Sequence, residues 1–344
     1  MIPQSLEKQI KAEANRLGFA LCGITTADAS EGFSHYKAWV EKGLFAGMHY
    51  LARPDALAKR QKPELLLAGC KSLICVGLPY PPAESLASIA AYARVPDYHL
   101  LMREKLTQLA SFIEELTGTK PASYIAVDSV AVLEKSFAHR AGLGLVGKNT
   151  LLLNEDFGTW FFLGELLLDL ELEPDPALTG DFCGDCRICV EACPTNALLG
   201  DKTMDASKCL SYLTIEHRGS IPVEHREAMG QQVFGCDICQ LICPKNKNAS
   251  SSGFAFCLKP TFEDEIDLIE ALSLREADFK ARYAGSSFLR AKYQGFRRNV
   301  IIALGNSHQA RALAVLEAAL PDEQDPVCKE SMLWAIERLK QTLQ

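Results

Sequence analysis

The stretch CGDCRICVEACP, residues 183–194, decides how the middle of this chain folds. Its cysteines follow the spacing C-x2-C-x2-C-x3-C-P, in which three neighbouring thiolates bind one [4Fe–4S] cluster and the cysteine before proline binds a second cluster. A similar run, CDICQLICP at 236–244, has one cysteine fewer. Cys209 lies between the two runs and brings the total to eight, which is the number that two such clusters need.

The spacing predicts two ligand sets that cross between the runs. A pair of zinc sites is the alternative, but zinc sites favour two separated C-x2-C pairs, whereas two C-x3-C-P endings favour iron–sulfur clusters. Two adjacent clusters conduct single electrons, so the sequence predicts electron transfer to a further redox centre. The first cluster takes Cys183, Cys186, Cys189 and Cys243, and the second takes Cys193, Cys209, Cys236 and Cys239.

The composition excludes several classes of protein. The chain has 344 residues and a net charge of −7, which predicts two or three domains and excludes a generally basic nucleic-acid binder. Its N-terminus lacks the pattern of a signal peptide, and no stretch has the length of a membrane-spanning helix, so we expect a cytoplasmic protein without membrane contacts. Thirteen cysteines in such a chain indicate metal or redox chemistry rather than disulfides.

Three regions differ in sequence pattern, and together they predict an α+β multidomain fold. Residues 1–172 alternate helical and strand patterns, as an α/β or α+β domain does. Residues 173–253 hold the cysteines, predict a domain like a bacterial ferredoxin with two [4Fe–4S] clusters, and end in a polar linker at 245–253. Residues 254–344 are helical, and a weak repeat of Ala303-Leu304 at Ala335-Ile336 predicts a HEAT-like array. The first region is expected to form helices at 5–17, 34–42, 97–116 and 132–140, and strands at 19–24, 73–77, 89–93, 123–127, 149–153 and 160–169.

The glycines of Gly142-x-Gly144-x-x-Gly147 match a dinucleotide-binding pattern letter by letter. That pattern needs a strand before it and a helix after it, whereas here a helical stretch comes first and a strand-like stretch follows. The same residues nearly match a phosphate-binding loop, but Asn149 stands where the Mg²⁺-binding hydroxyl belongs. Two interpretations remain: a turn that needs glycine backbone freedom, or a loop that lies against a large planar cofactor.

Asp128 ends the apolar stretch SYIAVD and precedes a helical pattern. Its carboxylate could therefore face a cleft at the end of a strand, or it could cap a helix that starts near Val130. On spacing alone the cap is the better interpretation.

A basic run without acidic residues extends from Lys280 to Arg298, and Phe288, Tyr293 and Phe296 interleave with it. Such a run can be a solvated helix face, but basic and aromatic residues together suit phosphate contact and base stacking. Against the negative net charge, we favour RNA contact. The predicted RNA-binding residues are His217, Arg218, Lys280, Arg282, Arg290, Lys292, Arg297 and Arg298.

Several separate stretches make the chain resemble the epoxyqueuosine reductases, cobalamin-dependent iron–sulfur enzymes of tRNA modification. The resemblance spans nearly the whole chain. It rests on Ala93-x3-Asp97-Tyr98-His99, Val127-Asp128-Ser129, Val132-Leu133-Glu134-Lys135, the glycine loop with Lys148-Asn149-Thr150, Phe161-Phe162-Leu163-Gly164-Glu165, the eight cysteines, Ser211-Tyr212-Leu213-Thr214-Ile215-Glu216 and Gly295-Phe296-x-Arg298-Asn299.

The resemblance implies the last step of queuosine biosynthesis. The epoxide of epoxyqueuosine at the wobble position of a tRNA would be reduced to the alkene of queuosine, with cob(I)alamin supplied with electrons by the two clusters. Asp128 matches the family's proton donor, which reverses the preference for a cap. For that role its pKa must be raised, and burial against the corrin would do so.

The resemblance also implies base-off cobalamin in the N-terminal region, with Arg53, Tyr98, Asp128, Asn149 and Ser211 as candidate contacts. His99 could ligate cobalt, but a supporting or RNA-facing role is favoured, because nothing in the family pattern requires protein ligation.

The expected partners are a tRNA that carries epoxyqueuosine in its anticodon and an external low-potential electron donor, and we expect a monomer. Two alternatives stay open. Another corrinoid iron–sulfur reductase, such as a reductive dehalogenase, usually has an export signal and lacks a basic helical region. A ferredoxin-type electron carrier would not develop corrin absorption when cobalamin is added.

Overall fold

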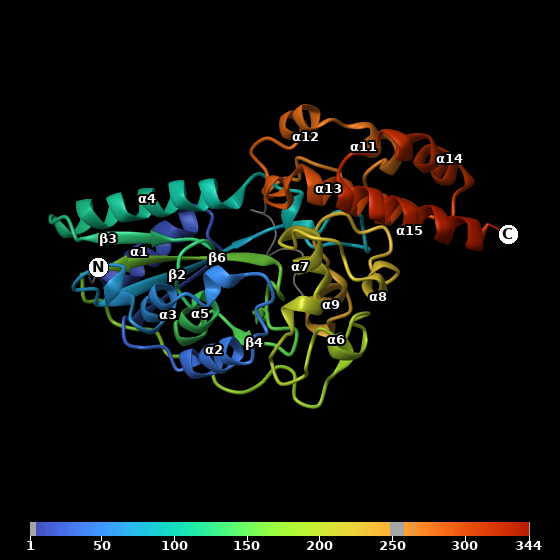
Figure 1. The fold of residues 1–344 in the computed structure, drawn as a ribbon. Helices are drawn as coiled ribbons and strands as arrows, with labels where there is room; N and C mark the ends of the chain where they lie inside the picture. The colour runs from blue at the N-terminus through green and yellow to red at the C-terminus, as the bar shows by residue number, and fades with distance from the viewer. Residues whose placement is uncertain (1–4, 248–257, 264, 344) are drawn as a thin grey trace.

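The computed structural model of the chain describes residues 5–247, 258–263 and 265–343. A sheet-containing part precedes the cysteine-rich segment, and a helical part follows it (Figure 1). The first part contains α1 (Leu6–Arg16), β1 (Leu21–Thr26), α2 (Gly32–Glu41), η1 (His49–Leu51), α3 (Pro54–Gln61), η2 (Pro63–Leu65), β2 (Ser72–Pro79), η3 (Ala91–Ala93), α4 (Tyr98–Thr117), β3 (Ser123–Ala126), α5 (Glu134–Arg140), β4 (Leu145–Val146), β5 (Leu152–Leu153) and β6 (Phe161–Leu168).

The cysteine-rich segment has only short helices, and longer helices follow it. In chain order these are α6 (Ile188–Glu191), η4 (Ala206–Lys208), α7 (Leu210–Ile215), α8 (Val223–Arg226), α9 (Ile238–Leu241), α10 (Pro244–Lys247), α11 (Leu268–Ser273), α12 (Glu276–Arg282), η6 (Ser287–Ala291), α13 (Lys292–Gly305), α14 (Ala310–Ala319), η7 (Leu320–Asp322) and α15 (Pro326–Thr342).

The four-stranded sheet has the order β1-β2-β6-β3, and each neighbouring pair is antiparallel. Antiparallel pairing makes this region α+β rather than parallel α/β. Every residue of β2 is buried, and β6 is nearly as enclosed. Both strands therefore read as continuous apolar runs, because helices cover both faces of the sheet.

Helices lie on both sides of the sheet (Figure 1), and alternate residues of β2 face different helices. Ile74 and Val76 pack in the core that α1 and α4 supply, whereas Leu73 and Cys75 pack with Phe137 of α5. This separation follows from the two-residue period of a strand. The same alternation places the charged residue Glu165 of β6 on the face of the sheet that α5 covers.

Local side chains and glycine define the ends of the helices. Ser5 caps α1, and the Asp97 carboxylate accepts the His99 N–H (3.0 Å) at the start of α4. Gly118 ends α4 with φ +66°, a conformation that favours glycine. The predicted strand at 89–93 is wrong: the segment forms the turn η3, because the buried Asp237 carboxylate accepts the Ala91 N–H (2.7 Å) and fixes it against the cysteine-rich segment.

The C-terminal helices form a core around α13 and α15, which Ile89, Ala93, Val233 and Phe234 from earlier in the chain join. These helices approach closely, since a Cβ on Gly305 would come within 2.8 Å of the Ala335 Cβ. Of the predicted linker, 245–247 belong to α10 and 248–253 lie outside the described residues. Among the helices of the described part, none combines the length and the apolar character needed to cross a bilayer.

Candidate active site

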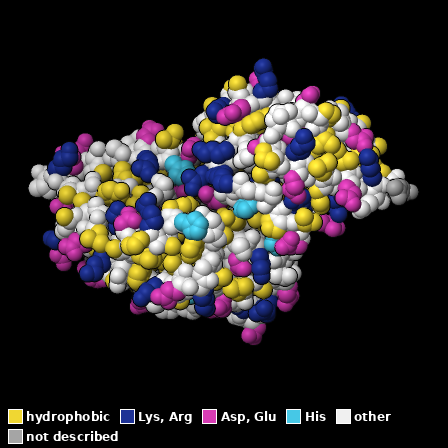
Figure 2. Space-filling model, viewed as in Figure 1, with side chains coloured by type: hydrophobic (Ala, Val, Ile, Leu, Met, Phe, Trp, Pro, Cys, Tyr) yellow, Lys and Arg dark blue, Asp and Glu magenta, His cyan; other side chains and the backbone are white. Residues whose placement is uncertain are grey.

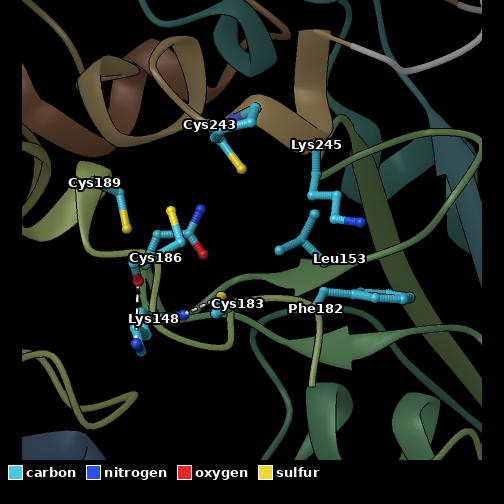
Figure 3. A pocket seen from close by; sticks show the side chains of 10 residues that line it. Lys148, Leu153, Phe182, Cys183, Cys186, Cys189, Cys243 and Lys245 are labelled. Carbon is cyan, nitrogen blue, oxygen red and sulfur yellow. Dashed lines mark hydrogen bonds between the residues drawn. The ribbon is translucent and has the colours of Figure 1, made fainter. Parts of the chain in front are cut away.

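Four cysteines from the two runs surround one cavity of about 100 Å³ (Figure 3). Cys243 comes from the second run, yet it faces the three cysteines that open the first. The structure therefore brings together the crossed set predicted for the first cluster: Cys183, Cys186, Cys189 and Cys243.

The two runs fold alike, which explains the crossing. Each forms one short helix, so that Cys189 and Cys239 lie within α6 and α9, while Cys193 and Cys243 follow those helices. Lys148, which directly follows the glycine loop 142–147, holds the first run by hydrogen bonds. Its amide donates to the Cys183 Sγ (3.3 Å), and its Nζ donates to the backbone oxygens of residues 184 (2.6 Å) and 186 (3.0 Å).

The other four cysteines also share one neighbourhood. Burial raises the pKa of Cys236 to about 12, and the Cys209 and Cys193 thiols raise it further. Burial likewise raises the pKa of Cys239 well above its ordinary value, and Cys236 and Cys209 add to the effect. Such thiols hold their protons unless a bound metal favours the thiolate.

The surroundings of both groups suit cluster ligation. The amide of Ala197 donates to the Cys193 Sγ (3.3 Å), as that of Lys148 does to Cys183. The buried Asn149 lines the first cavity, and its Nδ2 has no partner among the described residues. N–H donors near cluster sulfurs tune the reduction potential. Thiols with such donors therefore fit a [4Fe–4S] cluster.

The glycine loop is explained by its backbone. Gly142 has φ +79°, and a Cβ on Gly144 would come 2.2 Å from the backbone oxygen of Leu153. The helix α5 precedes the loop and the β4–β5 pair follows it. The turn interpretation thus accounts for these glycines without a nucleotide.

Asp128 lies in the loop between β3 and α5, with φ +52°. The helix α5 begins only at Glu134 and its N-cap is Leu133, so the interpretation of Asp128 as a helix cap is wrong. The Asp128 side chain is 61% exposed. The protein alone therefore does not bury this carboxyl.

His99 lies between two carboxylates. Its Nδ1 is 2.7 Å from the Asp97 Oδ1, and its Nε2 is 3.2 Å from the Asp128 Oδ2. Burial lowers the pKa of His99, but the hydrogen bonds to Asp128 and Asp97 outweigh it, so that its pKa is raised overall. Because both ring nitrogens are occupied, the contacts favour a role in orienting Asp128 over ligation of cobalt.

Glu134 holds the backbone of the same loop. Its Oε1 accepts the Asp128 N–H at 2.6 Å. Burial and the Asp128 carboxylate together raise the pKa of Glu134 to about 7, although the bond from the Asp128 N–H opposes them. Sequence reasoning did not assign Glu134 a function, although the Val132-Leu133-Glu134-Lys135 stretch marked it as a shared feature.

Near Asp128, residues from the N-terminal and C-terminal parts of the chain meet at one surface. The Arg290 guanidinium lies 5.8 Å from the ring centre of exposed Tyr50 and donates to the Glu216 Oε1 (2.6 Å). Burial raises the pKa of Tyr50, and the Glu216 and Asp128 carboxylates raise it further, which places Asp128 nearby. Figure 2 shows basic side chains and histidines gathered at the indentation between the sheet-containing part and the C-terminal helices. We call this surface, formed by Tyr50, His99, Asp128, Glu216 and Arg290, the notch.

The predicted cobalamin contacts do not form a single group. Tyr98 stacks on Phe162 (ring centres 4.0 Å apart) and adjoins His99 at the notch. Ser211 lies in α7, the helix that ends just before Glu216. Arg53 is exposed and pairs with Asp55 (3.3 Å), and Asn149 lies at the cluster cavity instead.

Comparisons with known proteins agree with this geometry. A family model described as a 4Fe-4S double cluster binding domain matches residues 182–246, which contradicts the zinc alternative. A second, described as epoxyqueuosine reductase QueG, DUF1730, matches residues 60–129. An epoxyqueuosine reductase of Pseudomonas aeruginosa is 38% identical over 99% of this chain and 96% of its own length. This chain belongs to the epoxyqueuosine reductase family.

Solved structures of epoxyqueuosine reductases share the fold. One from Streptococcus thermophilus has a TM-score of 0.87 and 30% identity, over 98% of this chain and 91% of its own. Another was crystallised with a tRNA-Tyr epoxyqueuosine-modified stem loop. It has a TM-score of 0.84 and 27% identity, over 97% of this chain and 99% of its own.

In this member of the epoxyqueuosine reductase family, part of the basic run is not available to RNA. Arg298 is 1% exposed, and its guanidinium donates to the backbone oxygens of Leu213 (2.7 Å), His217 (2.9 Å) and Gly219 (2.6 Å). The prediction of an RNA contact at Arg298 is therefore wrong. Stacking by Phe288 and Phe296 is also wrong, because both rings lie in the C-terminal core.

Other members of the run are paired with acidic residues from outside it. Arg297 donates to Glu323 (2.7 Å) with its side chain 17% exposed, and Arg282 pairs with Glu270. Lys280 pairs with Glu276 (2.7 Å) but remains exposed, as Lys292 does. The guanidinium of Arg218 donates to the backbone oxygens of residues 290 (2.8 Å) and 291 (2.9 Å), and the Nε2 of His217 contacts that of residue 220 (2.9 Å).

Replacing Arg298 by methionine is expected to lower the free energy of unfolding by about 2–4 kcal/mol, because three backbone oxygens would lose their donor. Urea unfolding of the two proteins measures the difference. Lys292→Met, on the same helix but exposed, is the control and should change stability by less than about 0.5 kcal/mol. Equal stability of the Arg298 variant and the wild type would contradict the structural role.

Proposed function

We propose that this chain is an epoxyqueuosine reductase that reduces the epoxide of epoxyqueuosine in a tRNA anticodon to the alkene of queuosine. The reaction takes up two electrons and two protons, and the epoxide oxygen leaves as water. The observation that carries the proposal is an exposed acid, Asp128, oriented by His99 in a chain whose eight cysteines form two groups of four. Close similarity to curated epoxyqueuosine reductases over nearly the full length supports it.

Asp128 is proposed to donate a proton to the epoxide oxygen as the ring opens. An alkoxide leaves poorly, so a positioned acid lowers the barrier. The His99 Nε2 forms a hydrogen bond with the Asp128 carboxyl, while the Asp97 carboxylate forms one with the His99 Nδ1. The ring thus keeps one orientation, and the carboxyl points to the open side of the notch, where its 61% exposure leaves room for the substrate.

Both groups of four thiols are proposed to hold [4Fe–4S] clusters, and base-off cobalamin is proposed to lie over the notch. Bound there, it would supply a strongly reducing cobalt centre to the epoxide carbon. Tyr98 adjoins His99 at the notch, and Arg53 and Ser211 are proposed as further polar contacts to this large, amide-edged cofactor. An external low-potential electron donor would reduce the clusters again after each turnover.

We propose three functional regions: 1–172 for cobalamin and catalysis, 173–253 for the clusters, and 254–344 as a HEAT-like region for tRNA. The molecule is proposed to act as a monomer. Seven residues remain the proposed RNA contacts, since each keeps an exposed or partly exposed side chain: His217, Arg218, Lys280, Arg282, Arg290, Lys292 and Arg297.

Charge reversal at Lys280 and Lys292 together is expected to weaken tRNA binding. The slope of the logarithm of the binding constant against the logarithm of the salt concentration should become shallower by about one for each lost phosphate contact. Binding measured across a salt series gives both quantities. Lys8→Glu, on α1 of the sheet-containing part, is the control. A slope identical to that of the wild type would show that these lysines are only solvated.

The decisive test is turnover of epoxyqueuosine-containing tRNA by the reconstituted protein with and without cobalamin. Queuosine should form only when cobalamin and a reductant are both present, and added cobalamin should give corrin absorption on the protein. Product without cobalamin, or no product with a fully reconstituted chain, would overturn the proposal.

A further inference from the structure

Glu165 is a buried acid that the proposed chemistry does not use. It is 0% exposed on β6, and neither carboxyl oxygen has a hydrogen-bond partner among the described residues. Its strand neighbours are Cys75 of β2 and Ala126 of β3, on the face that α5 covers. A carboxylate without a nearby cation is strongly disfavoured in such a place, so Glu165 is held as a neutral acid.

Glu134, the first residue of α5, is the ionisable group that acts on Glu165: burial raises the pKa of Glu165 well above its ordinary value, and the Glu134 carboxyl raises it further. Glu134 in turn holds the Asp128 N–H at 2.6 Å. The three acids thus form a series from the core of the sheet to the notch.

The backbone conformation of Asp128 explains why a contact from Glu134 matters. A non-glycine residue at φ +52° is strained and persists only when its surroundings fix it. The His99 ring fixes the carboxylate, and Glu134 fixes the amide. Without Glu134, the loop between β3 and α5 is free to relax, and the acid would leave its place.

We propose that Glu134 is a positioning residue that holds Asp128 in its strained, catalytically useful conformation. The inference rests on the proposed role of Asp128. It assigns Glu134 no contact with the substrate. Glu134 acts by accepting the Asp128 N–H and thereby keeping that amide bonded.

The dependence on pH follows from linkage. Burial and the Asp128 carboxylate raise the pKa of Glu134 to about 7 while the loop is in place. If the loop moves away, both effects weaken and the pKa falls back toward the ordinary value near 4.5. The held conformation is therefore most stable below the ordinary value and loses stability as pH rises through about 7. The other groups that face Glu134 and Glu165 are Cys75 from β2, His99 and Tyr98 from α4, Lys135 from α5 and Asp128 itself.

Amide hydrogen exchange of the full, cluster-loaded chain without substrate tests the proposal. The protection factor of the Asp128 amide should fall at least about tenfold between pH 5 and pH 8 in the wild type. Glu134→Gln keeps an acceptor oxygen but cannot ionise, so its protection should stay high and flat across this range. In Glu134→Ala, the protection factor of the Asp128 amide should be about 10- to 100-fold lower than in the wild type at every pH. Glu115→Ala, on the exposed side of α4, should match the wild type.

Wild-type protection in Glu134→Ala, or a pH response in Glu134→Gln like that of the wild type, would overturn the proposal.

Turnover on modified tRNA separates this inference from the proposed function. Glu134→Ala should lower kcat about tenfold or more and leave the KM for tRNA unchanged, because the substrate surface is intact. If protection is lost while kcat stays normal, Glu134 positions the loop but Asp128 is not the acid. If kcat falls while protection is unchanged, the positioning role is wrong.

Discussion

Asparagine in place of Asp128 is expected to lower turnover by roughly 10²–10⁴-fold, the usual contribution of a positioned general acid. The exchange removes the proton and little else. Asparagine tolerates the left-handed backbone that Asp128 adopts at φ +52°, and its side-chain oxygen can still accept from His99. The melting temperature, iron content and corrin spectrum should therefore match those of the wild type.

The control for this prediction is Asp156→Asn, an exposed aspartate in another loop of the same region. It should leave turnover unchanged. Because Asp128 caps no helix, a loss of stability cannot account for slow turnover by the Asp128→Asn variant. Normal turnover in that variant would mean that the proton comes from water or from the substrate.

The cysteine spacing could predict the ligand groups because few residues separate the sulfurs. In a run such as Cys183-x2-Cys186-x2-Cys189, the chain between neighbours is too short to place them far apart. The crossing of Cys243 was also predictable, since two similar runs form two similar short helices. Local chain geometry therefore determines this part of the site.

The roles of charged side chains were less predictable, because they depend on contacts between distant segments. Arg298 looks like any surface arginine of a helix, yet it is buried against backbone oxygens some 80 positions earlier. Glu165 looks like a misplaced charge in the apolar run of β6. Only the antiparallel register, which sets it opposite Cys75 and beneath α5, gives it neighbours.

Asp128 lies between these two cases. Its strand end was predictable from the apolar stretch, but its interpretation as a cap failed because α5 starts six residues later. The intervening loop is fixed by His99 from α4 and by Glu134 from α5. Long-range contacts thus decide which of two reasonable local roles this aspartate has.

The crossed ligation of the clusters predicts the outcome of a double replacement, Cys193→Ala with Cys209→Ala. The reconstituted wild type should hold about eight irons per chain. If both cysteines serve the second cluster, the double variant loses that cluster alone and keeps about four irons. If each run instead served its own cluster, the loss of Cys193 would damage the first cluster and the loss of Cys209 the second, and little iron would remain. Cys70→Ala, a half-buried thiol of a turn before β2, should keep all of its iron.

The complementary variant is Cys243→Ala. This cysteine belongs to the second run, but it faces the cavity of Cys183, Cys186 and Cys189. Its loss should therefore remove the first cluster, and the remaining iron should match that of the double variant. Combining Cys243→Ala with Cys209→Ala should then remove both clusters, because one ligand of each set is gone. Retention of about four irons by that combination would contradict the crossed arrangement, and electron transfer to the notch would need a different route.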